Sequence, residues 1–175
     1  MRKDIPIGDG SLRVGPRPRG GEWLSADLAD LGAEGFSFLV SLLTEGENRE
    51  LELEHERAEC RRYRLDFYSF PIVDRSLPAD REAFEALAGR LLARVVAGES
   101  GFLHCRAGLG RAPLLACTML TLHGMDVEQA WAVTEECRGQ SVPDTPAQRA
   151  WPRTPSGLLS LEEALALLTD SDSLM

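Results

Sequence analysis

The strongest chemical signal in the sequence is a short, glycine-containing stretch with one cysteine near its start and an arginine at its end. It reads His104-Cys105-Arg106-Ala107-Gly108-Leu109-Gly110-Arg111. A short apolar run precedes it and a longer one, 114–120, follows it, which predicts a strand, a tight loop and a helix. A loop at the amino end of a helix gathers unpaired N–H groups and the positive end of the helix dipole. The stretch is therefore a natural site for an anion.

The residue types within the loop indicate attack on a phosphate group. Cys105 lies at the mouth of the loop, where the backbone amides favour the nucleophilic thiolate. Gly108 and Gly110 let the backbone turn tightly and bring its amides inward. Arg111 supplies a planar guanidinium that can hold two phosphate oxygens. The alternative for Cys105 is a buried structural thiol, since free cysteine is common in cores.

This stretch, HCRAGLGR, resembles the signature loop of the cysteine-dependent protein tyrosine phosphatases, and residues 11–151 resemble the compact dual-specificity members. The resemblance implies that Cys105 attacks phosphorus and that Arg111 holds the phosphoryl group. It also implies that His104 supports the thiolate through hydrogen bonds that hold the loop, and that it is not a general base. The loop residues that would bind the substrate phosphate are Arg106, Ala107, Gly108, Leu109, Gly110 and Arg111. We expect the Arg106 side chain to point outward as a surface charge that contacts substrate.

A phosphoester leaving group must be protonated, so the reaction needs an acid from another segment. Asp74 is the candidate, on a loop that follows a predicted strand at 65–72. We expect that strand to neighbour the strand at 101–104. The carboxyl ends of parallel strands meet at one edge of a sheet, so Asp74 would lie close to the signature loop. Dual-specificity phosphatases carry their acid in a similar Pro-Ile-x-Asp context, which favours Asp74. The alternative acid, Asp80, is better explained as the N-cap of the next helix.

Two residues bear on hydrolysis of the resulting phosphocysteine. Gln148 resembles the glutamine with which some family members orient the attacking water; alternatively it is a surface residue of a short helix. Many members place a hydroxyl directly after the arginine, where it stabilises the departing thiolate, but this chain has Ala112. The alanine predicts slow breakdown of the intermediate. The loop around it resembles that of the phosphatases of regenerating liver, although the prenylation box of those proteins is missing from the last residues, Asp-Ser-Leu-Met.

Composition narrows the class of protein. The chain has 175 residues, 43% hydrophobic residues and a net charge of −9, which predicts one folded domain that binds neither nucleic acid nor an anionic membrane. No apolar run approaches the length of a membrane span, and we expect a cytoplasmic protein. The four cysteines lack metal-type spacing, so we expect reduced thiols, no metal and no cofactor. The sequence leaves the oligomeric state open.

The hydrophobic pattern predicts an α/β fold, a three-layer domain with a central, mostly parallel sheet flanked by helices, as in dual-specificity phosphatases. Strands are expected at 11–15 (an edge strand), 36–43, 65–72 and 101–104. Helices are expected at 25–33 with Ser25 as N-cap, 47–60, 79–97, 112–123, 127–138 and 160–168, with a loop and a short helix within 144–151. The 47–60 helix should be exposed, with Leu51, His55 and Ala58 on its inner side. We divide the chain into a tail (1–10), a catalytic domain (11–152) and a linker with an extra helix and acidic tail (153–175).

These patterns predict a phosphoprotein phosphatase that hydrolyses phosphotyrosine through a phosphocysteine intermediate. The chain is too short for the elements that deepen the pocket of tyrosine-specific members, so phosphoserine and phosphothreonine are further expected substrates, as are small phosphoesters. One alternative is a phosphate-loop binding module or near-inactive phosphatase that acts by protein interaction. A phosphoinositide phosphatase is disfavoured by Leu109, where such enzymes place a lysine. A rhodanese-like sulfurtransferase is disfavoured by the loop pattern together with Asp74.

Overall fold

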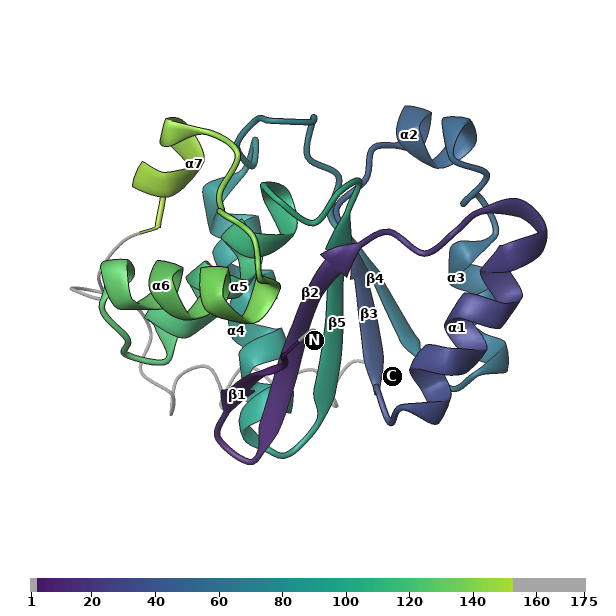
Figure 1. Ribbon diagram of the computed structural model, residues 1–175, viewed down its shortest axis with the longest axis horizontal. Coiled ribbons are helices and arrows are strands. Elements are labelled where there is room, and N and C mark those ends of the chain that lie inside the picture. The colour runs from purple at the N-terminus through teal and green to yellow at the C-terminus, as the bar shows by residue number, and fades with distance from the viewer. Residues whose placement is uncertain (1–2, 153–175) are drawn as a thin grey trace.

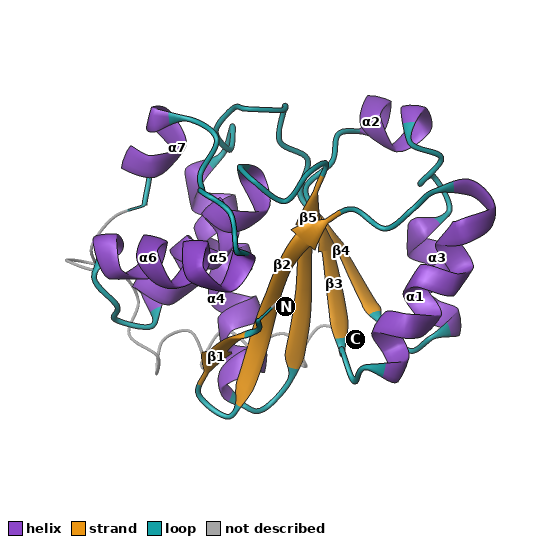
Figure 2. Ribbon diagram, viewed as in Figure 1, coloured by secondary structure: helices purple, strands orange, loops and turns teal. Residues whose placement is uncertain are grey.

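A computed structural model describes residues 3–152 of the chain (Figure 1). Its centre is a sheet of five strands in the order β1-β2-β5-β3-β4. The strands are β1 (Ile5–Ile7), β2 (Gly10–Pro16), β3 (Phe38–Ser41), β4 (Asp66–Ser69) and β5 (Ser100–Cys105). Only β1 runs antiparallel to its neighbour, so the sheet is mostly parallel (Figure 2). The strand that leads into the signature loop, β5, is the middle one.

Helices cover both faces of the sheet (Figure 1). One face carries α1 (Leu24–Ala33), preceded by a 3-10 turn at Gly21–Trp23, and α3 (Glu56–Arg62), while α2 (Glu45–Glu50) lies near the carboxyl edge. The other face carries α4 (Arg81–Val96), α5 (Arg111–Leu122) and α6 (Val127–Arg138), with α7 (Pro146–Ala150) beyond them. Each face has its own buried hydrophobic cluster. The predicted three-layer α/β fold is confirmed.

The helix that follows the signature loop is buried along nearly its whole length, as its apolar sequence predicts. Every residue of α5 except the last is buried. The hydroxyls of Thr118 and Thr121 donate to backbone carbonyls within the helix at 2.8 and 2.9 Å, so neither is left unsatisfied. A helix packed on all sides gives the loop at its amino end a rigid base.

The amino-terminal predictions need two corrections. Residues 11–15 belong to β2, which is an interior strand, because Ile5 and Ile7 of the predicted tail are buried and form the edge strand β1. Ser25 does not cap α1, since the helix already begins at Leu24, after a 3-10 turn. In both places a short element with little periodicity precedes the expected one.

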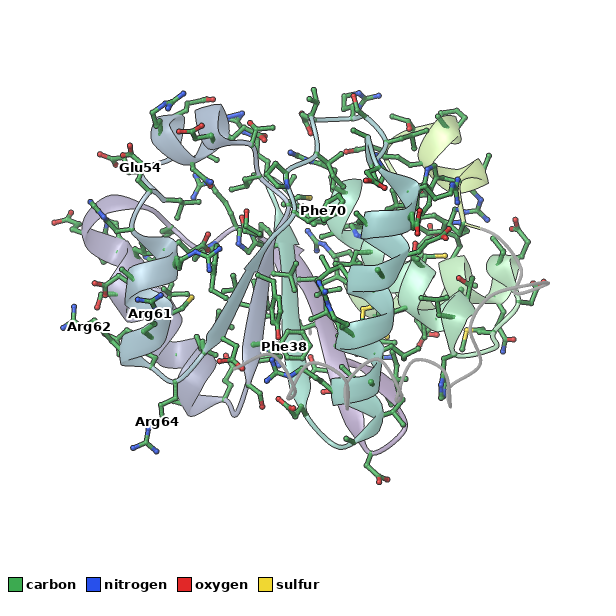
Figure 3. All side chains as sticks on the ribbon, turned by 180° about the vertical axis from the view of Figure 1, so that it is seen from behind. Phe38, Glu54, Arg61, Arg62, Arg64 and Phe70 are labelled. Atoms are coloured by element: carbon green, nitrogen blue, oxygen red, sulfur yellow. The ribbon has the colours of Figure 1, made fainter. Side chains whose placement is uncertain are left out.

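The predicted exposed helix at 47–60 is wrong in a way that matters for function. The segment forms two short helices, α2 and α3, separated by a turn in which Glu52 has a left-handed φ of 56°. The buried side chains are Glu47, Leu53, Glu56 and Cys60, whereas the predicted inner residues Leu51, His55 and Ala58 are half-buried or exposed. Figure 3 shows Glu54, Arg62 and Arg64 pointing away from the sheet. Two glutamates thus face inward.

The strand that precedes Asp74 is an edge strand, not the neighbour of β5 that the sequence predicted. The pairing places β3 between β4 and β5. Because all three strands run parallel, their carboxyl ends still meet at one edge, and the loop after β4 still reaches the signature loop. No helix within residues 3–152 is long and apolar enough to cross a membrane. The predicted helix at 160–168 lies outside the described residues.

Candidate active site

Close packing leaves no room for a side chain at either glycine of the signature loop, and the backbone at Gly108 is also left-handed. Gly108 has a left-handed φ of +69°, and a Cβ there would lie 2.4 Å from the backbone of Gly15 in β2. Gly110 has a φ of −120°, so its backbone is not left-handed. A Cβ on Gly110 would instead lie 2.8 Å from Asp144 Oδ2 and 2.9 Å from Gln148 Oε1. The loop therefore packs between β2 and the segment around α7.

An arginine at the end of α6 holds the outer side of the loop. Arg138 Nε donates to the Gly108 carbonyl and Arg138 Nη2 donates to the Ala107 carbonyl, both at 2.9 Å. These two carbonyls therefore face α6. Arg138 was not predicted as a site residue, because its signal in the sequence is only that of a basic residue in the last turn of a helix.

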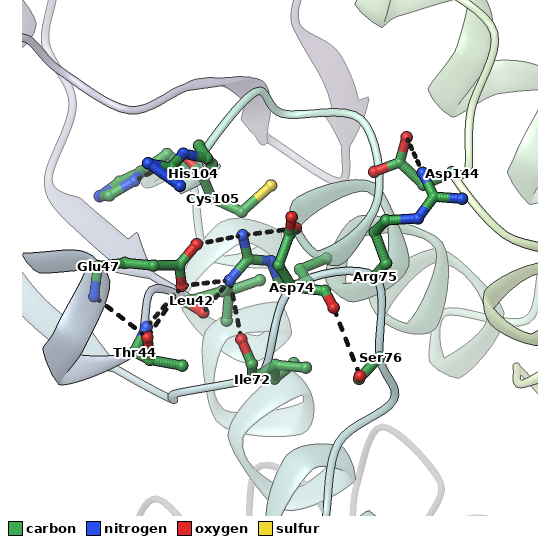
Figure 4. Close-up of polar contacts among 12 residues, drawn as sticks. Leu42, Thr44, Glu47, Ile72, Asp74, Arg75, Ser76, His104, Cys105 and Asp144 are labelled. Atoms are coloured by element: carbon green, nitrogen blue, oxygen red, sulfur yellow. Dashed lines mark hydrogen bonds and ion pairs between the residues drawn. The ribbon is translucent and has the colours of Figure 1, made fainter. Parts of the chain in front are cut away.

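The cysteines differ in their surroundings. All four are free thiols, and Cys105 ends β5 with only 3% of its surface exposed. Burial raises the pKa of Cys60 and of Cys117 to about 12, so these two thiols stay protonated at neutral pH. Burial also raises the pKa of Cys137. Figure 4 shows the Cys105 sulfur pointing to the side of the site where Asp74 lies.

The guanidinium of Arg111 is the most densely bonded group in the site. It is almost fully buried, and both terminal nitrogens donate to Glu47, at 2.7 and 2.9 Å. Nη1 also donates to the Ile72 carbonyl at 2.8 Å and to the Leu42 carbonyl at 3.4 Å, and Nη2 donates to Asp74 Oδ1 at 2.9 Å. Burial alone would lower the pKa of Arg111, but Glu47 and the nearby charge of Cys105 outweigh it and raise that pKa.

The N-terminal cap of α2 holds the Glu47 carboxylate in the position where it accepts from Arg111. Thr44 and Glu47 form a capping box at the start of α2, in which Glu47 Oε2 accepts from the Thr44 N–H at 3.0 Å. Burial would raise the pKa of Glu47, but hydrogen bonds from Arg111 and Thr44 outweigh burial and hold that pKa below its ordinary value. The Thr-x-x-Glu spacing was visible in the sequence, but the partner of the glutamate was not.

Asp74, the predicted acid, lies beside the Arg111 guanidinium. Its carboxylate contacts Arg111, and its side chain is 52% exposed, so it sits at the mouth of the site (Figure 4). The Ser76 hydroxyl donates to the Asp74 carbonyl at 3.4 Å, and Arg75 adopts a left-handed φ of 58° between them. The competing candidate, Asp80, caps α4 by accepting from the Ala83 N–H at 2.9 Å.

Gln148 is fully buried, which excludes its alternative interpretation as a surface residue. Thr145 caps α7 and accepts from the Gln148 N–H at 3.1 Å. The side-chain Nε2 of Gln148 donates to the Ser76 carbonyl at 3.2 Å, while Oε1 has no hydrogen-bond partner among the described residues. With Oε1 beside Gly110, this side chain links the Asp74 loop to the signature loop. An ion pair of 3.9 Å between Arg75 and Asp144 spans the same gap.

The remaining predicted site residues have mixed outcomes. His104 is completely buried; its Nδ1 is 3.4 Å from the Cys105 carbonyl oxygen and its Nε2 is 2.9 Å from Glu56 Oε1. Arg106 points outward, as expected, and pairs with Glu50 at the surface. Ala112 is fully buried at the start of α5 and, as an alanine, offers no hydroxyl to the cysteine.

The described part of the chain, 3–152, contains no group of three or more His, Cys, Asp or Glu side chains arranged to hold a metal ion. The site consists instead of one thiol, one guanidinium and a set of carboxyl and amide groups. Such a set can bind an oxyanion, attack it and transfer a proton.

Comparison with solved structures places the fold among the cysteine-based protein tyrosine and dual-specificity phosphatases. Kinase associated phosphatase, in a form whose catalytic site cysteine is replaced by serine, matches with a TM-score of 0.78 at 18% identity, covering 86% of this chain and 90% of that one. A putative protein tyrosine phosphatase from Leishmania major matches with a TM-score of 0.68 at 20% identity over 86% and 95% of the two chains. PTPMT1 in complex with PI(5)P matches with a TM-score of 0.60 at 15% identity over 97% of each chain. No protein-family model and no curated protein matches the chain.

Proposed function

We propose that this protein is a phosphoprotein phosphatase that cleaves phosphomonoesters through a phosphocysteine formed on Cys105. One observation carries the proposal: a thiol, a guanidinium and a carboxyl group from three separate segments meet at one edge of the sheet. Cys105 ends β5, Arg111 begins α5, and Asp74 contacts Arg111 Nη2 at 2.9 Å from the loop after β4. Phosphoryl transfer needs a nucleophile, a charge clamp and an acid in such proximity.

Substrate binding begins with an exchange of partners on Arg111. In the free protein the Asp74 carboxylate occupies Nη2 of the guanidinium. A phosphate dianion binds the same guanidinium more strongly than one carboxylate, because it offers more charge and can accept two hydrogen bonds. Asp74 is displaced from the guanidinium and becomes free to act on the leaving group. To act as the acid it must carry a proton in this complex.

The first chemical step forms the covalent intermediate. The Cys105 thiolate attacks phosphorus, the S–P bond forms and the P–O bond to the leaving group breaks. Asp74 gives its proton to the departing oxygen, and Arg111 with the loop amides holds the charge of the transferred phosphoryl group. Glu47 keeps the guanidinium in place through its two hydrogen bonds.

The second step releases inorganic phosphate. A water attacks phosphorus, its proton passes to the ionised Asp74, and the S–P bond breaks to return the thiolate. The free Oε1 of Gln148, beside Gly110, is a suitable acceptor to orient that water. Ala112 supplies no hydroxyl to stabilise the departing sulfur, so this step is slower than the first.

The slow second step favours one other output of the same site. A long-lived phosphocysteine or a tightly held phosphoprotein would make the domain a binding module, and the buried Ala112 supports this candidate. Solved structures of the same fold include one bound to a phosphoinositide. Turnover of phosphotyrosine, phosphoserine and phosphothreonine peptides, measured beside PI(5)P, distinguishes these substrates.

The test compares three variants with the wild-type protein in the hydrolysis of p-nitrophenyl phosphate and a phosphotyrosine peptide. Cys105→Ser should abolish turnover and leave the fold intact, because serine is not ionised at neutral pH. Cys137→Ser, the same change at a thiol outside the site, is the matched control and should keep full activity. Asp74→Ala should lower kcat by about 10²-fold while peptide binding persists, because the group that gives and takes the proton is lost while the phosphate-binding loop is unchanged. Turnover by Cys105→Ser at the wild-type rate would refute the proposal.

A further inference from the structure

Three consecutive carbonyl groups of the signature loop are bonded to groups outside the loop. The Arg106 carbonyl accepts from the N–H of Arg17, the residue that follows β2, at 3.3 Å. The next two carbonyls belong to Ala107 and Gly108, and they accept from Nη2 and Nε of Arg138, each at 2.9 Å. One guanidinium therefore holds two successive peptide units of the loop from the side of α6.

The direction of a carbonyl fixes the direction of the N–H group in the same peptide unit. The peptide bonds of the loop are trans, and in a trans peptide C=O and N–H point in opposite directions. The Ala107 carbonyl shares its peptide with the Gly108 N–H, and the Gly108 carbonyl shares its peptide with the Leu109 N–H. Because Arg138 holds both carbonyls toward α6, both N–H groups point to the other side, into the loop. Neither N–H donates to an acceptor within residues 3–152.

Two successive N–H groups that point to one side form a nest for an anion. Such a nest requires a left-handed or turn-like backbone, which Gly108 provides with its φ of +69°. The same arrangement is unfavourable while the nest is empty, because the two N–H dipoles have like ends together. A group that holds the carbonyls from outside offsets this repulsion. Arg138 is in the position to do so.

We propose that Arg138 is a positioning residue, which keeps the N–H groups of Gly108 and Leu109 directed at the phosphate before the phosphate binds. Its guanidinium bonds the outward carbonyls and acts on the phosphate only through the peptides. Donors that are already oriented bind an anion more tightly, because binding then involves no reorganisation of the loop. This role rests on the proposed function, in which the loop amides hold the phosphoryl group.

The position of Arg138 is fixed by the helix that carries it. Trp131 of α6 is fully buried, and its Nε1 donates to the Arg149 carbonyl at 3.1 Å, which ties α6 to α7. The helix ends directly after Arg138, where Gly139 has a left-handed φ of 71° and its N–H donates to the Glu135 carbonyl. The guanidinium thus approaches the loop from a packed helix.

A positive charge beside the loop would also attract an anion without orienting any amide, so the test must separate charge from geometry. Lysine makes this separation possible. It keeps the charge of Arg138 but has a single nitrogen, whereas arginine presents Nε and Nη2 as two donors fixed in one plane. Arg138→Lys therefore cannot hold the two carbonyls as Arg138 does.

The experiment measures the affinity of the full chain for tungstate, an oxyanion of the same tetrahedral shape as phosphate, by titration calorimetry. Arg138→Met should bind tungstate about 10²-fold more weakly than the wild type, because each of two charge-assisted hydrogen bonds contributes about tenfold. Arg138→Lys should bind it nearly as weakly as Arg138→Met. Arg90→Met, a change at an exposed arginine of α4, is the control and should bind tungstate like the wild type. Wild-type affinity in Arg138→Lys would show that charge alone acts and would overturn the proposal.

A second measurement needs no variant. In the nitrogen-15 NMR spectrum of the wild-type protein, tungstate should move the amide protons of Gly108 and Leu109 downfield, as expected when an N–H group donates to an anion. Amide signals that stay in place while tungstate binds would overturn the proposal, because the two groups would then not face the anion.

The outcomes also separate this inference from the proposed function, since tungstate binding requires no turnover. Weakened tungstate binding in Arg138→Met, together with a wild-type protein that hydrolyses no phosphoester, would refute the proposed function alone. Normal turnover by the wild type, together with unchanged tungstate affinity in Arg138→Met, would refute the role of Arg138 alone.

Discussion

The two ends of the signature loop are both closed by a glutamate from the segment between β3 and β4, but in different ways. At the α5 end, Glu47 accepts two hydrogen bonds from Arg111, which also donates to two backbone carbonyls. At the β5 end, Glu56 makes one contact of 2.9 Å with His104 and no well-aligned hydrogen bond with any described residue. Both acids are buried, yet only the first pair is fully satisfied.

The difference indicates that the two ends of the loop are held to different degrees. A guanidinium keeps its charge at any physiological pH, so the many hydrogen bonds around Arg111 fix geometry. The sparse contact at His104 leaves Nε2 and both Glu56 oxygens without a hydrogen bond among the described residues. We therefore interpret the α5 end, which carries the proposed phosphate clamp, as the end whose geometry is fixed most firmly.

The largest expected effect comes from replacing Arg111 itself, at the α5 end of the loop. Arg111→Lys keeps the charge but removes the planar fork, so it cannot hold Glu47 and a phosphate together. We expect kcat/KM for p-nitrophenyl phosphate to fall about 10³-fold, as when a transition-state donor is removed. Arg62→Lys, the same change at an exposed arginine, is the control. An effect below tenfold would show that charge alone suffices at this end.

A smaller effect is expected when the partner of the arginine is neutralised. Glu47→Gln should lower the free energy of unfolding by about 2 kcal/mol at pH 7, because a charge-assisted hydrogen bond is lost. The pKa of Glu47 is held below its ordinary value of 4.5, so its stabilisation is complete above that value and is lost as the pH falls through the lower, folded-state pKa. The difference between wild type and variant should therefore shrink in acid.

Urea unfolding at a series of pH values measures this difference. Glu45→Gln is the matched control on the same helix, where an exposed pair with Arg49 should contribute less than about 1 kcal/mol. A difference that stays constant down to pH 3 would mean that Glu47 stabilises the loop by packing and not by charge.

The smallest expected effect concerns Ala112, which brings no polar group to the α5 end. Ala112→Ser adds a hydroxyl at the start of the helix, where it can donate to the departing sulfur. We expect the steady-state rate to rise about tenfold while the initial burst of product is unchanged. Ala116→Ser, one turn further along the same buried helix, adds a hydroxyl away from the cysteine and is the control. A rise of equal size in both variants would argue against a specific role for the hydroxyl.

The sequence predicted the parts of the site that lie in one continuous stretch or carry a local pattern. The strand, loop and buried helix around Cys105 and Arg111 follow from two apolar runs separated by a glycine-containing loop. The N-cap at Asp80 was also a local signal and was confirmed. The buried position of Gln148 was not predictable, because in the sequence it is only a polar residue of a short helix.

Residues 47–60 illustrate the limit of sequence periodicity. Their many charges predicted one exposed helix, because charged side chains ordinarily face water. In the structure the same residues form two short helices that turn Glu47 and Glu56 inward. These carboxylates can be buried because Arg111 and His104, which are more than 45 residues away in the chain, lie beside them at the two ends of one loop. No local pattern contains that information.

The sequence by itself thus determined the chemistry available: a thiol, a guanidinium and an acid, with the anion-binding loop that joins the first two. It did so because this loop is encoded by adjacent residues and by the dipole of the helix that follows. Only the tertiary structure decided which carboxylates contact the loop: Glu47 and Asp74 contact Arg111, and Glu56 contacts His104. The physical reason is that a buried charge is stable only beside its partner, and the fold alone sets which groups become partners.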